Sequence, residues 1–228
     1  MRMARMAAKA VVGVVLIPGL ALAQASGSTG SAGSANKFND SWFWGINGGA
    51  MFLTAGFDQS TKVTAPSVGG EWLITRTHIG LRLAIDQSFF NEQTGIGDPS
   101  AAGGVRAVAV KDWRRYSGEM YFFTSTTSSL RPYAGLGLAL NVLQNSSPMG
   151  TYNSQGSMDS TNAAVNDFSS KVSSVWTAGA QYSLGRSALF LQGSAMPTKN
   201  NFILNRSSYT FMVQGGLRYN FGSAIEKM

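Results

Sequence analysis

The 228-residue chain contains no cysteine, a single histidine and few charged residues. The lack of cysteine excludes disulfide bonds, thiolate nucleophiles and zinc–sulfur sites. Charged residues make up 13% of the chain, against about 25% in ordinary globular domains. With 27 glycines as well, this composition is unusual for a cytosolic domain. The 13 Phe, 7 Tyr and 5 Trp in turn argue against intrinsic disorder.

The first 23 residues have the form of a secretory signal peptide. Arg2, Arg5 and Lys9 form a basic start. A 13-residue apolar run, Ala10 to Leu22, follows and leads into the small-x-small sequence ALA. We expect cleavage after Ala23; the alternative is a buried N-terminal helix.

Removal of this segment lowers the formal net charge from +7 to +4. No cluster of Lys and Arg remains to favour a nucleic-acid partner. No later segment has 18 consecutive apolar residues, so no transmembrane helix is predicted. An exported chain of this kind is periplasmic, secreted or a membrane barrel.

Beyond a Gly/Ser-rich tail at residues 24–40, apolar residues recur with the two-residue period of β-strands. In one segment Ile79, Leu81, Leu83 and Ile85 share a face. Eight such segments are predicted, with short connections alternating with long ones, as in an up-and-down antiparallel meander. They span residues 42–54, 68–77, 79–90, 113–124 (with a start as early as 105), 130–143, 173–184, 188–196 and 208–221.

The apolar face of these segments is expected to point outward, toward lipid. We expect this face to be free of charged residues in all eight segments. A bilayer favours such a face, because an Arg or Lys side chain in the middle of the membrane costs roughly 2–4 kcal/mol. The opposite face is small and polar, and aromatic residues gather near the strand ends, as in interfacial girdles. The girdle candidates are Trp42, Trp44, Phe122, Tyr182, Tyr219 and Phe221 at one end, and Phe52, Phe89, Tyr116, Tyr209 and Trp176 at the other.

The predicted fold class is therefore all-β: an eight-stranded antiparallel up-and-down transmembrane β-barrel with a polar, side-chain-filled interior. The barrel is expected over residues 41–221, followed by a short tail at residues 222–228. The alternative is a soluble all-β domain with its apolar face inward.

Seven charged residues are expected inside the barrel, where a desolvated charge must be paired. We predict a mid-barrel cluster of Glu71, Arg82 and Glu119, with further charges above and below it. Its role is either structural filling or a narrow ion path. The full set is Glu71, Arg82, Asp86, Arg115, Glu119, Arg131 and Arg218, with Asp86 and Arg115 above the cluster and Arg131 and Arg218 below it.

Three short motifs resemble small OmpA-type, OmpX-like outer-membrane barrels: residues 131–139 (RPYAGLGLA), 176–182 (WTAGAQY) and 216–221 (GLRYNF). The resemblance implies a monomer in the outer membrane of a Gram-negative cell, in contact with outer-membrane lipid and lipopolysaccharide. It also implies that Leu217, Tyr219 and Phe221 form a signal for the barrel-assembly machinery. The tail after Phe221 departs from the usual form and is too short for a peptidoglycan-binding domain.

No catalytic, cofactor or metal site is predicted. His78 lies in a short turn at the presumed periplasmic end, away from surface lipid. Gly95 to Gly97 is interpreted as a loop turn without the context of a nucleotide site. The long connection from Asn145 to Val172 contains weak cation ligands, namely Asp159, Asn162, Asn166 and Asp167, whose spacing fits no standard calcium loop.

The leading functional hypothesis is a non-enzymatic, surface-exposed envelope protein. An adhesin or binding protein that acts through the long connection at residues 145–172 is the alternative. A narrow channel and a lipid-modifying enzyme at the outer rim are less favoured.

Overall fold

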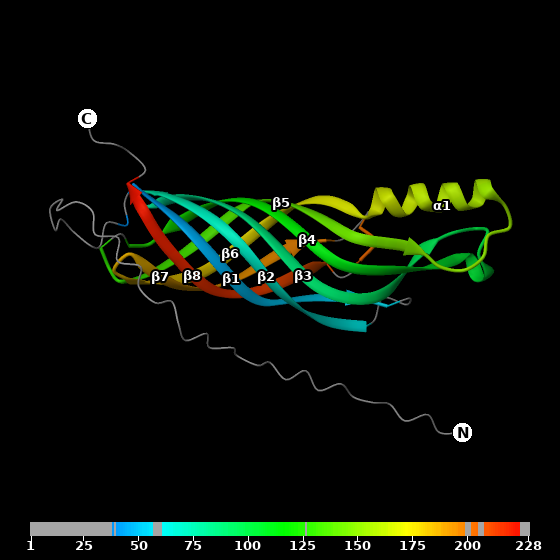
Figure 1. Cartoon of the computed structure of the whole chain (residues 1–228), viewed down its shortest axis with the longest axis horizontal. Helices are drawn as coiled ribbons and strands as arrows, with labels where there is room; N and C mark the ends of the chain where they lie inside the picture. The colour runs from blue at the N-terminus through cyan, green and yellow to red at the C-terminus, as the bar shows by residue number, and fades with distance from the viewer. Residues whose placement is uncertain are drawn as a thin grey trace, which may run out of the picture. The chain divides into compact units, whose positions relative to one another are not determined.

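The computed structural model describes residue 38 and residues 40–56, 61–125, 127–198, 202–204 and 208–223. Eight antiparallel strands close into a barrel in sequence order (Figure 1), which confirms the predicted eight-stranded up-and-down barrel. Among the described residues, no helix is long and apolar enough to cross a membrane. The strands are β1 (Ser41–Ala55), β2 (Thr61–Arg76), β3 (Ile79–Gly97), β4 (Val105–Phe123), β5 (Leu130–Pro148), β6 (Ser170–Leu184), β7 (Ser187–Pro197) and β8 (Tyr209–Ser223); a 3-10 helix, η1 (Ala102–Gly104), follows β3, and α1 (Gln155–Phe168) follows β5.

The barrel closes between the first and last strands. Ser41 of β1 lies opposite Thr75 of β2 on one side and Ser223 of β8 on the other. We call this end of the barrel the inner end; the connections β2–β3, β4–β5 and β6–β7 lie there, and the connections β1–β2, β3–β4, β5–β6 and β7–β8 lie at the outer end. Closure pairs the backbone groups of each strand with two neighbours, as a structure in lipid requires.

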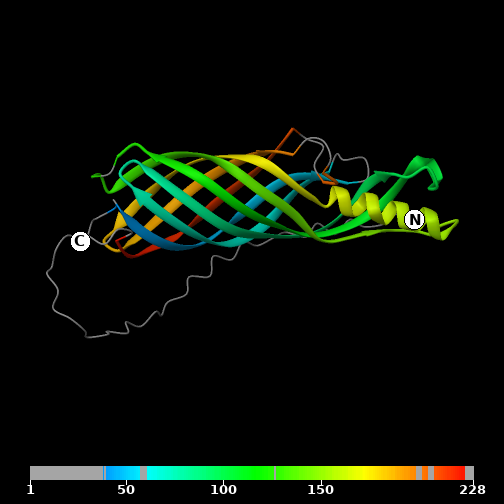
Figure 2. The same cartoon turned by 90° about the horizontal axis from the view of Figure 1, so that it is seen from above.

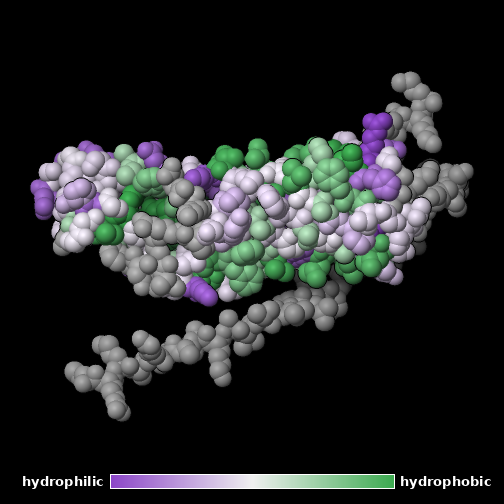
Figure 3. Space-filling view, turned by 180° about the vertical axis from the view of Figure 1, so that it is seen from behind, coloured by the Kyte–Doolittle hydropathy of each residue, from purple (hydrophilic) through white to green (hydrophobic). Residues whose placement is uncertain are grey.

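The side chains alternate as expected, with large apolar residues outside. Leu81, Leu138 and Phe211 are 47%, 62% and 53% exposed, whereas Arg82 and Glu119 are 0% and 1% exposed. All eleven predicted girdle aromatics are exposed as well. Figure 3 shows apolar side chains spread over the strands, with the most hydrophilic residues toward the ends. We call this exposed apolar surface the belt.

The belt is not free of charge, and that expectation was wrong. Arg76 and Arg114 share the outer face of β2 and β4. Arg76 is the last residue of β2, and Arg114 donates a hydrogen bond from Nε to Oε1 of Gln87 at 2.9 Å. A long basic side chain near a strand end can extend toward water, which makes the position of Arg76 compatible with lipid.

The inner end of the barrel is filled by apolar and aromatic side chains, the inner apolar cluster. Tyr121 and Tyr133 stack with ring centroids 4.7 Å apart, and Phe38 packs against Phe123 at 4.6 Å. Phe38 belongs to the barrel rather than to the flexible tail expected at residues 24–40, because its ring is buried there. The rest of that tail except Asp40, the signal peptide and residues 224–228 lie outside the described residues. The cluster consists of Phe38, Phe43, Leu73, Tyr121, Phe123 and Tyr133.

The outer end also contains a cluster of apolar side chains inside, so the interior is not polar throughout, contrary to expectation. Trp113 packs against Phe202 of the β7–β8 connection, with ring centroids 4.9 Å apart. The backbone of Ile203 is held by hydrogen bonds with Thr94 at 2.8 Å and Phe168 at 2.9 Å. This outer apolar cluster comprises Met51, Leu53, Ala55, Ala65, Ile96, Val108, Val110, Trp113, Leu143, Val165, Phe202, Ile203, Leu204 and Met212.

Three strands extend past the others at the outer end. The β3–β4 pairing runs on to Gly97 and Val105, although β2 pairs with β3 only as far as Ser88. β5 follows as far as Pro148, and α1 packs against β5 and β6 (Figure 2). Two features of this outer part differ from the sequence-based description. Gly95 to Gly97 belong to β3 rather than to a loop turn, and the connection after β5 contains a helix.

Candidate functional site

The middle of the barrel holds a buried ionic cluster centred on Arg82. Its Nε lies 2.6 Å from Oε2 of Glu71, and its Nη1 lies 2.5 Å from Oε1 of Glu119. The second oxygen of Glu119 accepts a hydrogen bond from Thr177 at 2.6 Å. The structure thus brings together the three residues that the strand alignment placed at one level.

Arg218 of β8 belongs to the same cluster rather than below it. Its Nε is ion-paired with Oε1 of Glu71, and its Nη1 donates to Oε1 of Gln181 at 2.8 Å. The guanidinium carbon lies 3.9 Å from the ring centroid of Phe190. Glu71 is therefore shared by two arginines from strands on either side of it, which ties β8 to β2 and β3 across the closure of the barrel.

A second ionic cluster lies nearer the outer end. Nη2 of Arg115 is 2.7 Å from Oδ2 of Asp86, and Nη1 donates to Ser194 at 3.1 Å. The amide nitrogen of Gln214 donates to Asp86 at 2.6 Å and to Asn47 at 2.9 Å. We call Glu71, Arg82, Asp86, Arg115, Glu119 and Arg218 together the charge network.

Arg131, the seventh predicted interior charge, lies apart from the charge network. Its guanidinium carbon is 4.6 Å from the ring centroid of Phe38, and it donates a hydrogen bond to Ser183. It is buried at the inner end of the barrel. Its place below the middle is as expected, and its described contacts include the aromatic ring of Phe38.

The charge network contains three carboxylates and three arginines, and each has an opposite charge within ion-pair distance. Breaking such a pair by removing one partner strands the other charge and typically costs 3–5 kcal/mol. This arrangement cross-links neighbouring and opposite strands. Neither cluster contains the histidine base that a hydroxyl nucleophile most often uses.

A third polar cluster, which the sequence did not predict, joins the strand extension to α1. Nε of Arg106 lies 2.5 Å from Oδ2 of Asp98, which also accepts from Thr161 of α1 at 3.0 Å. Nη1 of Arg106 donates to the carbonyl oxygens of Met149 and Thr151 at 3.0 and 3.1 Å. We call this arrangement, with Ser100, the outer cap.

The outer cap depresses the pKa of Asp98. Hydrogen bonds from Ser100, at 2.8 Å from its backbone N and 2.6 Å from its hydroxyl, stabilise the carboxylate, and the Arg106 side chain adds to the effect. The carboxyl pKa therefore lies well below its usual range. The signal that could have revealed this cluster is the sequence Asp98-Pro99-Ser100, since an Asp followed by Pro and Ser favours a turn closed by the Asp side chain.

The histidine considered for catalysis lies at the opposite end of the barrel from the side chains considered for cation binding. His78 lies in the β2–β3 turn at the inner end, with Nδ1 3.0 Å from the carbonyl oxygen of Phe123. Asp159, Asn162, Asn166 and Asp167 all lie on α1, and Asp159 accepts from Gln155 at 2.9 Å. Within the described part of the chain, no group of three or more His, Cys, Asp or Glu residues could hold a metal.

The predicted assembly signal lies on the outer face of β8. Leu217, Tyr219 and Phe221 are all exposed, and the rings of Tyr219 and Phe221 meet edge to face at 5.2 Å. Tyr219 is paired with Trp44 on β1 and with Ser187 on β7. The three side chains thus remain available on the strand that closes the barrel.

No protein-family model and no curated protein matches the sequence. Among solved structures, the fold is similar to that of Neisserial surface protein A, with a TM-score of 0.51 and 10% identity over 79% of this chain and 97% of that one. The N-terminal β-barrel domain of Pseudomonas aeruginosa OprF gives a TM-score of 0.47, with 12% identity over 80% of this chain and 98% of that one. Ail of Yersinia pestis gives a TM-score of 0.44, with 13% identity over 79% of this chain and 99% of that one. At such identity the first likeness establishes the fold alone, and the other two add no weight to it. The resemblance to small OmpA-type outer-membrane barrels is therefore confirmed for the fold, and this chain has that eight-stranded architecture.

Proposed function

We propose that the protein is an integral outer-membrane barrel with a non-enzymatic role in the cell envelope, presenting the strand extension and α1 outside the cell. The observation that carries this proposal is the inversion of polarity: Leu138 is 62% exposed, whereas Arg82 is fully buried. A soluble domain would bury the first and expose the second. A barrel in lipid does the reverse.

The proposal includes export by the signal peptide and insertion by the barrel-assembly machinery, which would recognise Leu217, Tyr219 and Phe221. The chain would then lie among outer-membrane lipid and lipopolysaccharide as a monomer, without cofactor or metal. Cell fractionation with gel electrophoresis tests this. The chain should partition with outer membranes and migrate differently before and after boiling. Recovery in the soluble periplasmic fraction, with one unchanged mobility, would refute the proposal.

The second candidate is an adhesin that acts through the connection at residues 145–172. It is favoured by the outer cap, which fixes α1 to the strand extension through Thr161 and Asp98. An ordered element on a rigid scaffold is suited to binding. Replacing residues 152–168 with a short Gly/Ser linker should abolish binding of whole cells to immobilised extracellular matrix. Unchanged binding, with the barrel still heat-modifiable, would remove this candidate.

A lipid-modifying enzyme at the outer rim is the least favoured function. Acyl hydrolysis needs a base beside a hydroxyl nucleophile, and the single histidine lies at the inner end. Lipid A mass profiles of a deletion strain should match those of the parent. A changed acylation pattern, restored by the gene, would establish the enzyme instead.

A further inference from the structure

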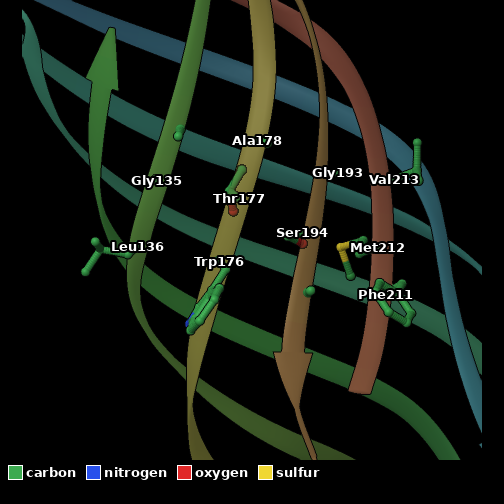
Figure 4. Close-up of a pocket in the computed structure, with 12 residues that line it drawn as sticks. Gly135, Leu136, Trp176, Thr177, Ala178, Gly193, Ser194, Phe211, Met212 and Val213 are labelled. Carbon is green, nitrogen blue, oxygen red and sulfur yellow. The ribbon is translucent and has the colours of Figure 1, made fainter. Parts of the chain in front are cut away.

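The belt is interrupted by a groove on the outer face of β5, β6, β7 and β8, with a volume of about 590 Å³. Strand register aligns its residues in two rows that cross the four strands. One row, small except for Val213, forms the floor, and the other, large except for Ala195, forms a wall (Figure 4). The floor row is Ala134, Ala178, Gly193 and Val213; the wall row is Leu136, Trp176, Ala195 and Phe211.

Gly193 leaves space on the floor that barrel packing does not require. A Cβ atom added to it would meet only the carbonyl oxygen of Met212, at 4.0 Å. By contrast, a Cβ on Gly179 of the neighbouring strand would lie 2.5 Å from the carbonyl oxygen of Leu191. Glycine within a strand weakens it, and often marks a place where another group approaches closely. The space above Gly193 is thus a property of the outer surface.

Apart from the ring nitrogen of Trp176, the groove offers no polar side-chain group to an occupant. Thr177 and Ser194 lie beneath it, but their hydroxyls are engaged inside the barrel. Thr177 donates to Glu119 at 2.6 Å, and Ser194 accepts from Arg115 at 3.1 Å. The outward side chains are hydrocarbon, apart from the ring nitrogen of Trp176. The occupant must therefore be apolar and narrow.

The groove is not at one level of the belt: on β5, Ala134 is four residues from the inner start of the strand at Leu130, whereas on β7 and β8 the groove reaches the outer strand ends. Ala195 is two residues from the end of β7 at Pro197, and Phe211 is two residues from the start of β8 at Tyr209. With strands about 4.8 Å apart, its floor extends roughly 14 Å across the four strands. In the orientation of the proposed function, on which this inference rests, its β7–β8 side opens to the outer leaflet.

A flexible single chain fits this groove better than a second barrel does. Trp176 is 69% exposed and stands beside the floor. A second barrel has a convex surface, which would touch the Trp176 ring of the wall before it reached Gly193. In lipid, close packing rather than the hydrophobic effect selects the occupant, since lipid tails are as apolar as the groove. We propose that this groove holds one acyl chain of an outer-leaflet lipopolysaccharide molecule.

Native mass spectrometry of the full barrel tests this inference. The wild type, Gly193→Leu and Gly48→Leu would be reconstituted in nanodiscs that contain both rough lipopolysaccharide and phosphatidylethanolamine. Gly48 is the matched control, because its added Cβ would also be free, 3.8 Å from the carbonyl oxygen of Ser67, and it does not line the groove. The fraction of barrels retaining one lipopolysaccharide should fall about tenfold in Gly193→Leu, as a loss of roughly 1.4 kcal/mol would give, and stay unchanged in Gly48→Leu.

Equal retention by all three proteins would overturn the inference. Selective retention of phosphatidylethanolamine would also overturn it. A dimer that Gly193→Leu abolishes would overturn it as well, because the occupant of the groove would then be a second copy of the chain. If Gly193→Leu loses its heat-modifiable mobility, Ala178→Leu fills the same floor and replaces it. If the barrel still fractionates with outer membranes, each of these results overturns the acyl-chain inference and leaves the proposed function standing. If the wild-type barrel does not fractionate with outer membranes, the proposed function and the inference are both refuted.

Discussion

Arg82 on β3 and Glu119 on β4 lie directly opposite each other, and their side chains meet inside the barrel at 2.5 Å. Asp86 and Arg115 repeat the relationship four residues further along β3, at 2.7 Å. Both ionic contacts are thus cross-strand pairs of one hairpin. They fix the register of β3 and β4, because a slip of one strand by one residue would turn its two charges toward the belt and leave the two charges of the other strand unpaired.

Arg82→Met should destabilise the folded barrel by about 3 kcal/mol, because Glu119 would lose its ion-pair partner in a buried site. Urea unfolding of the protein folded in lipid vesicles measures this change. The double variant Arg82→Met/Glu119→Gln should lose less than the sum of its single changes, since no carboxylate is then left unpaired there. An unchanged unfolding midpoint in Arg82→Met would show that the Arg82–Glu119 ion pair does not stabilise the folded barrel.

The wild-type barrel should show no steady conductance in planar bilayers. The charge network fills the middle, and apolar clusters occupy both ends, including Tyr121 at the inner end and Trp113 at the outer end. Arg82→Leu should remain silent as well, because it leaves both clusters in place. A steady wild-type current that this substitution alters or removes would instead support an ion path.

Gly137→Ala should lower the folding stability by roughly 1–3 kcal/mol, as overpacking of a filled interior does. The added Cβ would lie 2.0 Å from the carbonyl oxygen of Gly118 and 2.6 Å from Cα of Glu119. Gly118→Ala is the matched control, since its Cβ points outward and meets only Leu83 Cδ2, at 3.6 Å. Equal unfolding midpoints for the two variants would contradict the close approach of β4 and β5.

Acid should loosen the outer cap. Because the folded pKa of Asp98 lies below its ordinary value of 3.8, its contribution is complete above that value and is lost as the pH falls below it. Hydrogen-exchange protection of α1, corrected for intrinsic exchange, should therefore decline below about pH 4. Asp98→Asn should reduce protection at pH 7 and remove this decline, whereas Asp167→Asn, on the exposed side of α1, should change neither. An unchanged profile in Asp98→Asn would show that α1 is held by other contacts.

The strand core could be predicted from sequence because the two-residue period is unbroken there. The ends could not, for identifiable reasons. The irregular register between Ser88 and Asn91 disrupts the alternation of β3, so its outer part resembles a loop. Pro66 similarly obscures the first part of β2, where the strand pairs only with β1 and a proline is tolerated.

The helix and the outer cap were missed because few of their residues are apolar. Only Thr161 and Val165 of α1 are buried, so its sequence carries almost no helical period. Its start is marked by Ser154, which accepts a hydrogen bond from the backbone of Ser157. The interior charges, in contrast, were identified because an ionic residue in an alternating strand is conspicuous. Their partners across the barrel depend on closure, which places Arg218 beside Glu71.

The most direct test of the inverted polarity uses a nitroxide spin label. The chain has no cysteine, so a label can be attached at one introduced position. In outer-membrane vesicles, a label at Leu138→Cys should relax strongly with oxygen, which dissolves in lipid, and weakly with a water-soluble nickel chelate. A label at Asp159→Cys on α1 should show the opposite. Strong relaxation by the nickel chelate at residue 138 would place the belt in water and contradict the proposed membrane barrel.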